Sequence, residues 1–147
     1  MSVTRAPAHW ACAPLKTSVP NARHQARREI ESAGFVAPDS DAAYSIELAV
    51  TELVTNAVHA FANAASGRSV RPASLIDVCL RWTSASVVVE VTDELPGVPT
   101  MCPTSADDES GRGLALVALL GTWGVRPTPV GKTVWCEIPY EARGVAC

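Results

Sequence analysis

The sequence lacks the hallmarks of several large protein classes. It has no apolar run near the roughly 20 residues that span a bilayer, and its first residues contain no apolar signal segment. Its five cysteines include no CxxC pair, which argues against a disulfide framework or a zinc knuckle. Its net charge of −3 offers no general electrostatic argument for nucleic-acid binding. We therefore expect a cytoplasmic protein with reduced cysteines and with neither a membrane nor a nucleic acid as its partner.

The apolar content of the sequence is high enough for one hydrophobic core. Of its 147 residues, 48% are hydrophobic and 18% are charged, and this balance predicts a single folded domain over 1–147. We expect the core of this domain at about 10–139 and a flexible tail at 140–147.

The order of the periodic segments predicts an α+β fold. Residues 83–85 are typical of a tight hairpin turn between two strand-like runs. The expected elements are a strand at 8–16, helices at 21–33 and 41–65, strands at 74–82 and 86–92, a helix at 113–121, a strand from 123 and a last strand at 132–139. Strands joined by tight turns favour a two-layer sandwich, in which helices cover one face of a mixed, mostly antiparallel sheet.

The helix expected at 41–65 carries a narrow polar stripe. At about 100° per residue, Asn56, His59 and Asn63 all fall within about 40° of Glu52. The apolar residues fall on a separate broad arc, which predicts the core face of this helix: Ile46, Val50, Leu53, Ala57, Ala60 and Phe61. An ordinary solvated face has the same spacing, but no Lys or Arg occurs in 39–65 to balance the acid.

A carboxylate and an amide one helical turn apart suit phosphoryl chemistry. The amide oxygen of Asn56 is a hard ligand for Mg²⁺. The Glu52 carboxylate can accept a proton from an attacking hydroxyl or water. His59 is either a hydrogen-bonding neighbour of such a site or only a part of the stripe.

A long loop and a glycine-containing helix start form a second candidate feature. Asp93 ends a β-branched run, and the Pro- and Gly-containing segment 94–110 predicts a mobile lid. Gly111, Arg112 and Gly113 then open an apolar helix, where free backbone N–H groups suit a phosphate and Arg112 adds a cation. A lone GxG also precedes many ordinary helices, and this one matches neither the P-loop nor the GxGxxG pattern.

Four segments together resemble one family, the Bergerat-type (GHKL) ATP-binding domains. ELAVTELVTNAVHA (47–60) resembles its N box, VTDELPGVP (91–99) its first glycine box, ESGRGLALVALL (109–120) its second and GKTVWCEIP (131–139) its closing strand. Within this family the sequence is most similar to the stand-alone anti-sigma-factor serine/threonine kinases of bacteria and to their actinobacterial relatives. The resemblance covers about 10–139, with the segments in the same order.

This resemblance implies a set of ATP-site residues. It makes Glu52 the general base, Asn56 the ligand of Mg²⁺ and Asp93 the carboxylate that receives the adenine amino group. The other residues that it places around ATP are Gly97 in the first glycine box, Gly111, Arg112 and Gly113 at the phosphate-binding end of the lid, and Thr133 near the adenine. The implied activity is phosphorylation of an anti-anti-sigma-type protein, sequestration of a sigma factor, or both. Related kinases are often homodimers.

The first glycine box departs from the family pattern. It usually reads D-x-G-x-G, but here Leu95 stands in place of the first glycine. This change supports an alternative function, in which the chain is a non-catalytic nucleotide-binding regulator that acts by protein–protein contact.

Basic residues on the helix expected at 21–33 form a candidate partner surface. Arg23 and Arg27 lie one turn apart, which is typical either of a solvated basic face or of a docking patch for an acidic protein. An arginine near the start of this helix contacts partners in the anti-sigma kinases, and Arg23 occupies the similar position. The resemblance therefore implies that Arg23 and Arg27 contact a sigma factor or its antagonist.

Overall fold

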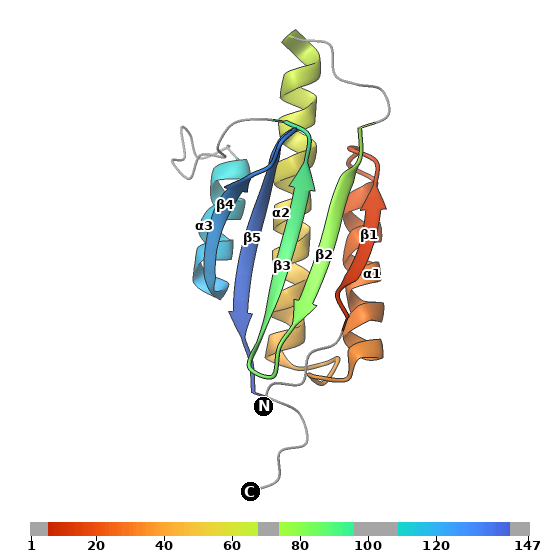
Figure 1. Ribbon diagram of the computed structural model, residues 1–147, viewed down its shortest axis with the longest axis vertical. Coiled ribbons are helices and arrows are strands. Elements are labelled where there is room, and N and C mark those ends of the chain that lie inside the picture. The colour runs from red at the N-terminus through yellow and green to blue at the C-terminus, as the bar shows by residue number, and fades with distance from the viewer. Residues whose placement is uncertain (1–5, 68–73, 96–108, 142–147) are drawn as a thin grey trace, which may run out of the picture.

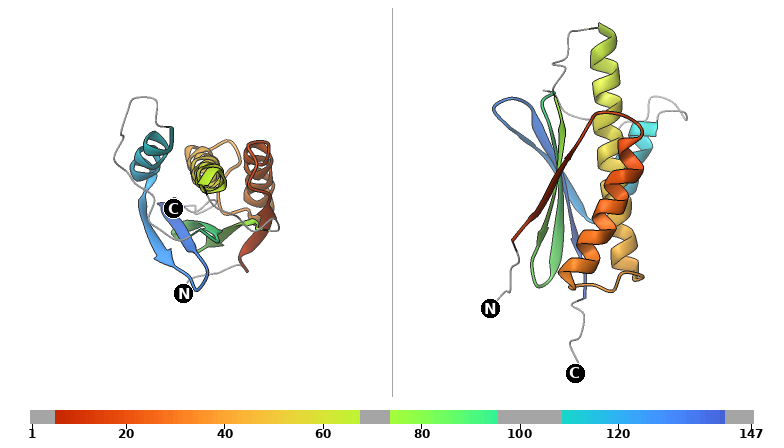
Figure 2. Two further views of the ribbon diagram at one scale, coloured as in Figure 1. Left: turned by 90° about the horizontal axis from the view of Figure 1, so that it is seen from above. Right: turned by 90° about the vertical axis from the view of Figure 1, so that its right-hand side faces the viewer.

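The computed structural model describes residues 6–67, 74–95 and 109–141, with the backbone alone at 64–67 and 109–114. Its elements, in the predicted order, are β1 (Ala8–Cys12), α1 (Ser18–Ala33), α2 (Asp41–Gly67), β2 (Ile76–Trp82), β3 (Ser86–Asp93), α3 (Glu109–Leu120), β4 (Thr122–Pro127) and β5 (Lys132–Pro139). The strands form one sheet in the order β1-β2-β3-β5-β4, and the helices cover one of its faces (Figures 1 and 2). The predicted α+β sandwich is confirmed, but each pair of neighbouring strands is antiparallel, so the sheet is not mixed.

Two helix boundaries follow from side-chain and backbone chemistry that the sequence already shows. Ser40 caps α2, since its hydroxyl oxygen accepts the Ala43 N–H at 3.2 Å. Gly34 ends α1 in the left-handed region, with φ at 74°, and donates its N–H to the Ile30 carbonyl at 3.2 Å. α1 starts at Ser18, earlier than predicted, because Pro20 falls in the first turn, where its missing N–H breaks no helical bond.

Two further boundaries differ from the predictions. β1 ends at Cys12 rather than at 16, because Pro14 has no N–H to give to the sheet. It is an edge strand, since β2 is its neighbour in the sheet and it stands first in the strand order. α3 begins at Glu109 rather than at 113, and the helix dipole favours an acidic residue in this first turn.

The hydrophobic core lies between the sheet and the helices. Val87, Val89 and Val91 of β3 are almost completely buried and belong to the same cluster as the apolar faces of α1 and α2. Ala60 is partly exposed, whereas the other predicted core residues of α2 are buried: Ile46, Val50, Leu53, Ala57 and Phe61. Asp93 continues the alternation of β3, so its side chain also faces the helix layer.

Tyr140 packs against the fold, although the sequence analysis assigns it to the tail. Its ring lies near Phe35 and Trp82, with centroids 6.4 Å and 6.0 Å away. Its hydroxyl donates a hydrogen bond to the Thr83 carbonyl, in the hairpin turn between β2 and β3. The described fold therefore extends to the residue after β5.

Some predictions fall on parts of the chain that the structure does not describe. Gly97 and most of the expected lid lie within 96–108, and most of the expected tail lies within 142–147, both outside the described residues. Among the helices of the described residues, none combines the length and the apolar character needed to cross a membrane.

Candidate functional site

The four residues of the polar stripe of α2 differ in how much of each is exposed to solvent. Asn56 has only 9% of its surface exposed, Glu52 and His59 are partly exposed, and Asn63 is exposed. No hydrogen bond joins the Asn56 amide to another described residue, but the amide is not fully enclosed, because among the described residues only Trp10 Nε1 is a fully buried side-chain polar atom without a partner. A mostly buried amide one turn from a partly exposed carboxylate suits a ligand site better than an ordinary solvated face does.

The residues of this stripe fit a magnesium–phosphate site. The amide oxygen of Asn56 is available as one ligand, and Mg²⁺ usually takes one or two protein ligands while water and substrate phosphates fill its other positions. No group of three or more His, Cys, Asp or Glu side chains within the described ranges could hold a metal ion by itself. One amide ligand, with water and nucleotide phosphates in the other positions, fits the usual coordination of Mg²⁺.

Asp93 forms a buried ion pair that the sequence analysis does not predict. The side chains of Asp93 and Lys132 are only 2% and 7% exposed. Lys132 Nζ lies 3.0 Å and 3.1 Å from the two Asp93 carboxylate oxygens, and it also donates to the Leu95 carbonyl at 3.0 Å. The backbone N–H of Leu95 donates to Asp93 Oδ1 at 2.8 Å. The carboxylate expected to receive an adenine amino group is thus already bonded to a lysine.

The register of β3 and β5 produces this pair. Asp93 and Lys132 stand directly opposite each other on the two antiparallel strands, and opposed residues point to the same face of a sheet. Gly131 permits a close approach to β3, since a Cβ at this position would lie 2.0 Å from the Asp93 carbonyl oxygen. The sequence signal for Lys132 is modest. It is one of only two lysines, at the start of a largely apolar strand.

Thr133 lies on the other face of the sheet. It stands opposite Thr92, and the two hydroxyl oxygens are 2.7 Å apart. Because successive residues of a strand point to opposite faces, the Thr133 side chain points away from Asp93 and from the helix layer. The family resemblance places both Thr133 and Asp93 at the adenine, but the structure puts their side chains on opposite faces of the sheet. Lys132 occupies the position beside the Asp93 carboxylate.

The glycine-containing segment forms the first turns of α3 rather than a loop before it. In an α-helix that begins at Glu109, the backbone N–H groups without a helical acceptor are those of residues 109–112. Gly111 and Arg112 belong to this set, whereas Gly113 does not. The segment still offers the N-terminal N–H groups that suit a phosphate.

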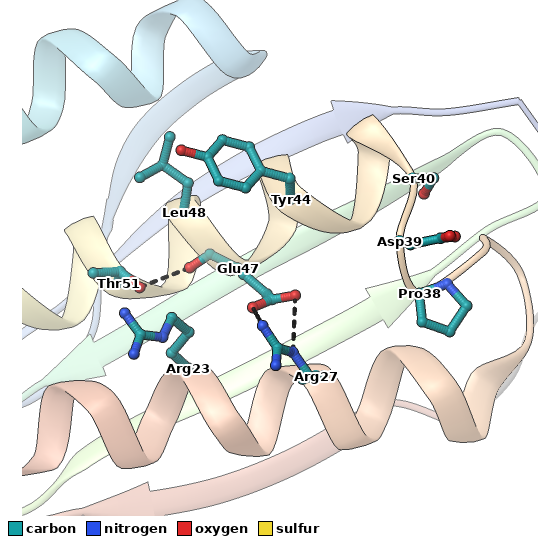
Figure 3. A pocket seen from close by; sticks show the side chains of 9 residues that line it. All are labelled: Arg23, Arg27, Pro38, Asp39, Ser40, Tyr44, Glu47, Leu48 and Thr51. Carbon is teal, nitrogen blue, oxygen red and sulfur yellow. Dashed lines mark hydrogen bonds and ion pairs between the residues drawn. The ribbon is translucent and has the colours of Figure 1, made fainter.

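A separate pocket of about 420 Å³ lies between α1 and the first half of α2 (Figure 3). Arg23 and Arg27 project toward it from α1, and Glu47 faces them from α2. Hydrogen bonds from Arg27 to Glu47 at 3.0 Å and 3.4 Å raise the pKa of the Arg27 guanidinium. Arg23 has no ion-pair partner among the described residues. The remaining residues that line the pocket are Pro38, Asp39, Ser40, Tyr44, Leu48 and Thr51.

Comparison with known protein families identifies this fold. The histidine kinase-like ATPase domain matches residues 12–136, which is most of the chain. The chain therefore belongs to the histidine kinase-like ATPase domain family, and this membership supports ATP binding. No curated protein matches the sequence. The match confirms the predicted GHKL-type ATPase fold.

Proposed function

We propose that this chain is an ATP-dependent serine/threonine protein kinase of the anti-sigma-factor type. Its protein substrate is an anti-anti-sigma-type antagonist, and it also sequesters a sigma factor. The observation that carries this proposal is the position of Glu52 one turn before the mostly buried side chain of Asn56, within a histidine kinase-like ATPase fold.

Each polar group near the phosphates has a distinct task in this proposal. Glu52 accepts the proton of the attacking serine or threonine hydroxyl. Asn56 helps to hold Mg²⁺, which when bound neutralises charge on the phosphate oxygens. The first backbone N–H groups of α3, including that of Gly111, contact the phosphates, and Arg112 adds a positive charge.

Phosphate transfer from labelled ATP·Mg²⁺ to the purified antagonist tests the role of Glu52. Glu52→Gln should still bind ATP by calorimetry but lose about 100-fold or more in transfer rate, since a general base typically contributes about 10²–10⁴-fold. Glu141→Gln, at an exposed carboxylate just after the last strand, is the matched control and should transfer normally. Equal transfer by Glu52→Gln and the unaltered protein would refute the assignment of the base.

The Asp93–Lys132 ion pair favours a second candidate function, a non-catalytic nucleotide-binding regulator. Because Asp93 is already paired with Lys132, it gains less from a hydrogen bond to a nucleotide base than an unpaired carboxylate would. A protein with this fold can therefore bind ATP weakly and transfer no phosphate. Calorimetry with ATP and Mg²⁺, read beside the transfer assay, separates the two functions. ATP binding by a protein that transfers no phosphate to its cognate antagonist would favour the regulator.

The pocket between α1 and α2 supports a docking site for an acidic partner. The charge of Arg27 is balanced by Glu47, whereas the charge of Arg23 is not balanced by an ion pair within the described residues. In our proposal a carboxylate of the sigma factor or its antagonist therefore pairs with Arg23, and Arg27 acts mainly by holding α1 against α2.

Charge reversal on α1 tests this docking site. Arg23→Glu should weaken binding of the partner about 10-fold or more, because a like charge then faces the partner's carboxylate. Arg28→Glu makes the same charge change on an exposed residue of α1 that does not line the pocket, and it should weaken binding less than about threefold. Equal losses would indicate a general charge effect and contradict a specific contact at Arg23.

A further inference from the structure

The Asp93–Lys132 pair uses nearly all the hydrogen-bonding capacity of both side chains. The ammonium group has three N–H donors, and the structure provides three acceptors, namely both Asp93 oxygens and the Leu95 carbonyl. An ionised carboxylate can accept about four hydrogen bonds, of which Asp93 already receives three. Counting the described residues alone, the unused position is on Oδ2.

This arrangement changes what Asp93 can offer to a nucleotide base. A neutral amino group that approaches Asp93 meets a carboxylate whose charge is already compensated at 3.0 Å by an ammonium group. To take the place of Lys132, it would have to leave that ammonium group without partners at a position where only 7% of the side chain reaches solvent. The amino group therefore gains little binding energy, whether it approaches the paired carboxylate or displaces Lys132.

We infer that Lys132 determines how the nucleotide site treats the purine base, because it holds Asp93 in a closed ion pair and removes most of the preference for a 6-amino purine. The inference rests on the proposed ATP site and concerns only its base end. The site then recognises a nucleotide by its phosphates and by the shape of its purine ring. The exocyclic amino group contributes little to the binding free energy.

Affinities for ATP and for purine riboside 5′-triphosphate, which lacks only the 6-amino group, test this inference on the unaltered protein. We expect calorimetry with Mg²⁺ to give dissociation constants within about threefold of each other, whereas a hydrogen bond to a free carboxylate would favour ATP on the order of 10- to 100-fold. A preference of the unaltered protein for ATP of 10-fold or more would overturn the inference without any variant.

Two substitutions at position 132 then show whether the lysine is the cause. Lys132→Thr frees Asp93 and should raise the preference for ATP over the purine analogue to about 10-fold or more. Lys132→Arg keeps the positive charge and should retain the ratio near one. Circular dichroism establishes first that each variant is folded, and the measurement on the unaltered protein decides the question if Lys132→Thr is not.

The outcomes separate this inference from the function on which it rests. If both triphosphates bind and Lys132→Thr leaves their ratio unchanged, Lys132 has only a structural role and the inference is wrong. If neither triphosphate binds to the unaltered protein or to the folded Lys132→Thr variant, the proposed nucleotide site itself fails.

Discussion

Two ion pairs of this protein join opposite charges in very different surroundings. The side chains of Lys132 and Asp93 are 7% and 2% exposed, whereas those of Arg27 and Glu47 are 56% and 11% exposed. The first pair ties the end of β3 to the start of β5, and the second ties α1 to α2 beside an open pocket.

The difference in burial determines what each pair contributes. Charges in a dry site depend strongly on each other, because neither can be solvated if its partner is lost. Charges that reach water depend on each other weakly and are screened by salt. The buried pair therefore controls stability and access to Asp93, whereas the exposed pair leaves the neighbouring Arg23 accessible to a partner.

Loss of the buried lysine should have the largest effect on stability. Lys132→Met removes the charge but retains the length of the side chain, and it should lower the free energy of unfolding by about 3–5 kcal/mol because Asp93 is left charged and buried. Urea unfolding measures this change. The double variant Asp93→Asn/Lys132→Met, which removes both charges, should recover most of the loss. A loss below about 1 kcal/mol in Lys132→Met would show that solvent reaches Asp93 and would contradict the comparison.

A third charged group, Glu90, should give an intermediate effect that depends on pH. Burial raises the pKa of Glu90, but hydrogen bonds from Arg126 at 2.9 Å and Arg81 at 2.6 Å outweigh it and hold the pKa below the usual 4.5. Because the pKa is lower in the folded state, the ionised carboxylate stabilises the fold above about pH 4.5, and this contribution is lost as the pH falls through the folded pKa.

Unfolding of Glu90→Gln and of the unaltered protein at several pH values measures this contribution. The difference in stability between them should be constant near neutral pH and should shrink in acid. We expect it to be smaller than the effect at Lys132, because the arginines beside Glu90 are about half exposed. A difference that grew in acid would have the wrong sign for a lowered pKa.

Loss of the exposed arginine should have the smallest effect. Arg27→Met should lower the free energy of unfolding much less than Lys132→Met does, because the Arg27 side chain is 56% exposed and its charge was largely solvated while it was paired with Glu47. The loss should decrease further in high salt, as measured by urea unfolding with and without added salt. A loss as large as that of Lys132→Met would mean that Glu47 depends on Arg27 as Asp93 depends on Lys132.

Sequence reasoning was most successful where the evidence was local. The hairpin turn predicted at residues 83–85 depends on residues close together in the sequence, and the structure has it, with the Ser86 N–H donating to the Thr83 hydroxyl oxygen. The helical spacing of Glu52 and Asn56 is equally local. The burial of Asn56 was not predictable from spacing, because it depends on how the other elements pack around α2.

The amino-acid sequence alone determined the order of the elements, the antiparallel hairpins and the polar stripe of α2, because periodicity and turn chemistry act between near neighbours. Only the tertiary structure decided which side chain lies beside Asp93. Residues 93 and 132 are 39 positions apart, and the register of β3 against β5 brings them together. A shift of one residue in that register would reverse the faces of β5 and put Thr133 where Lys132 now lies.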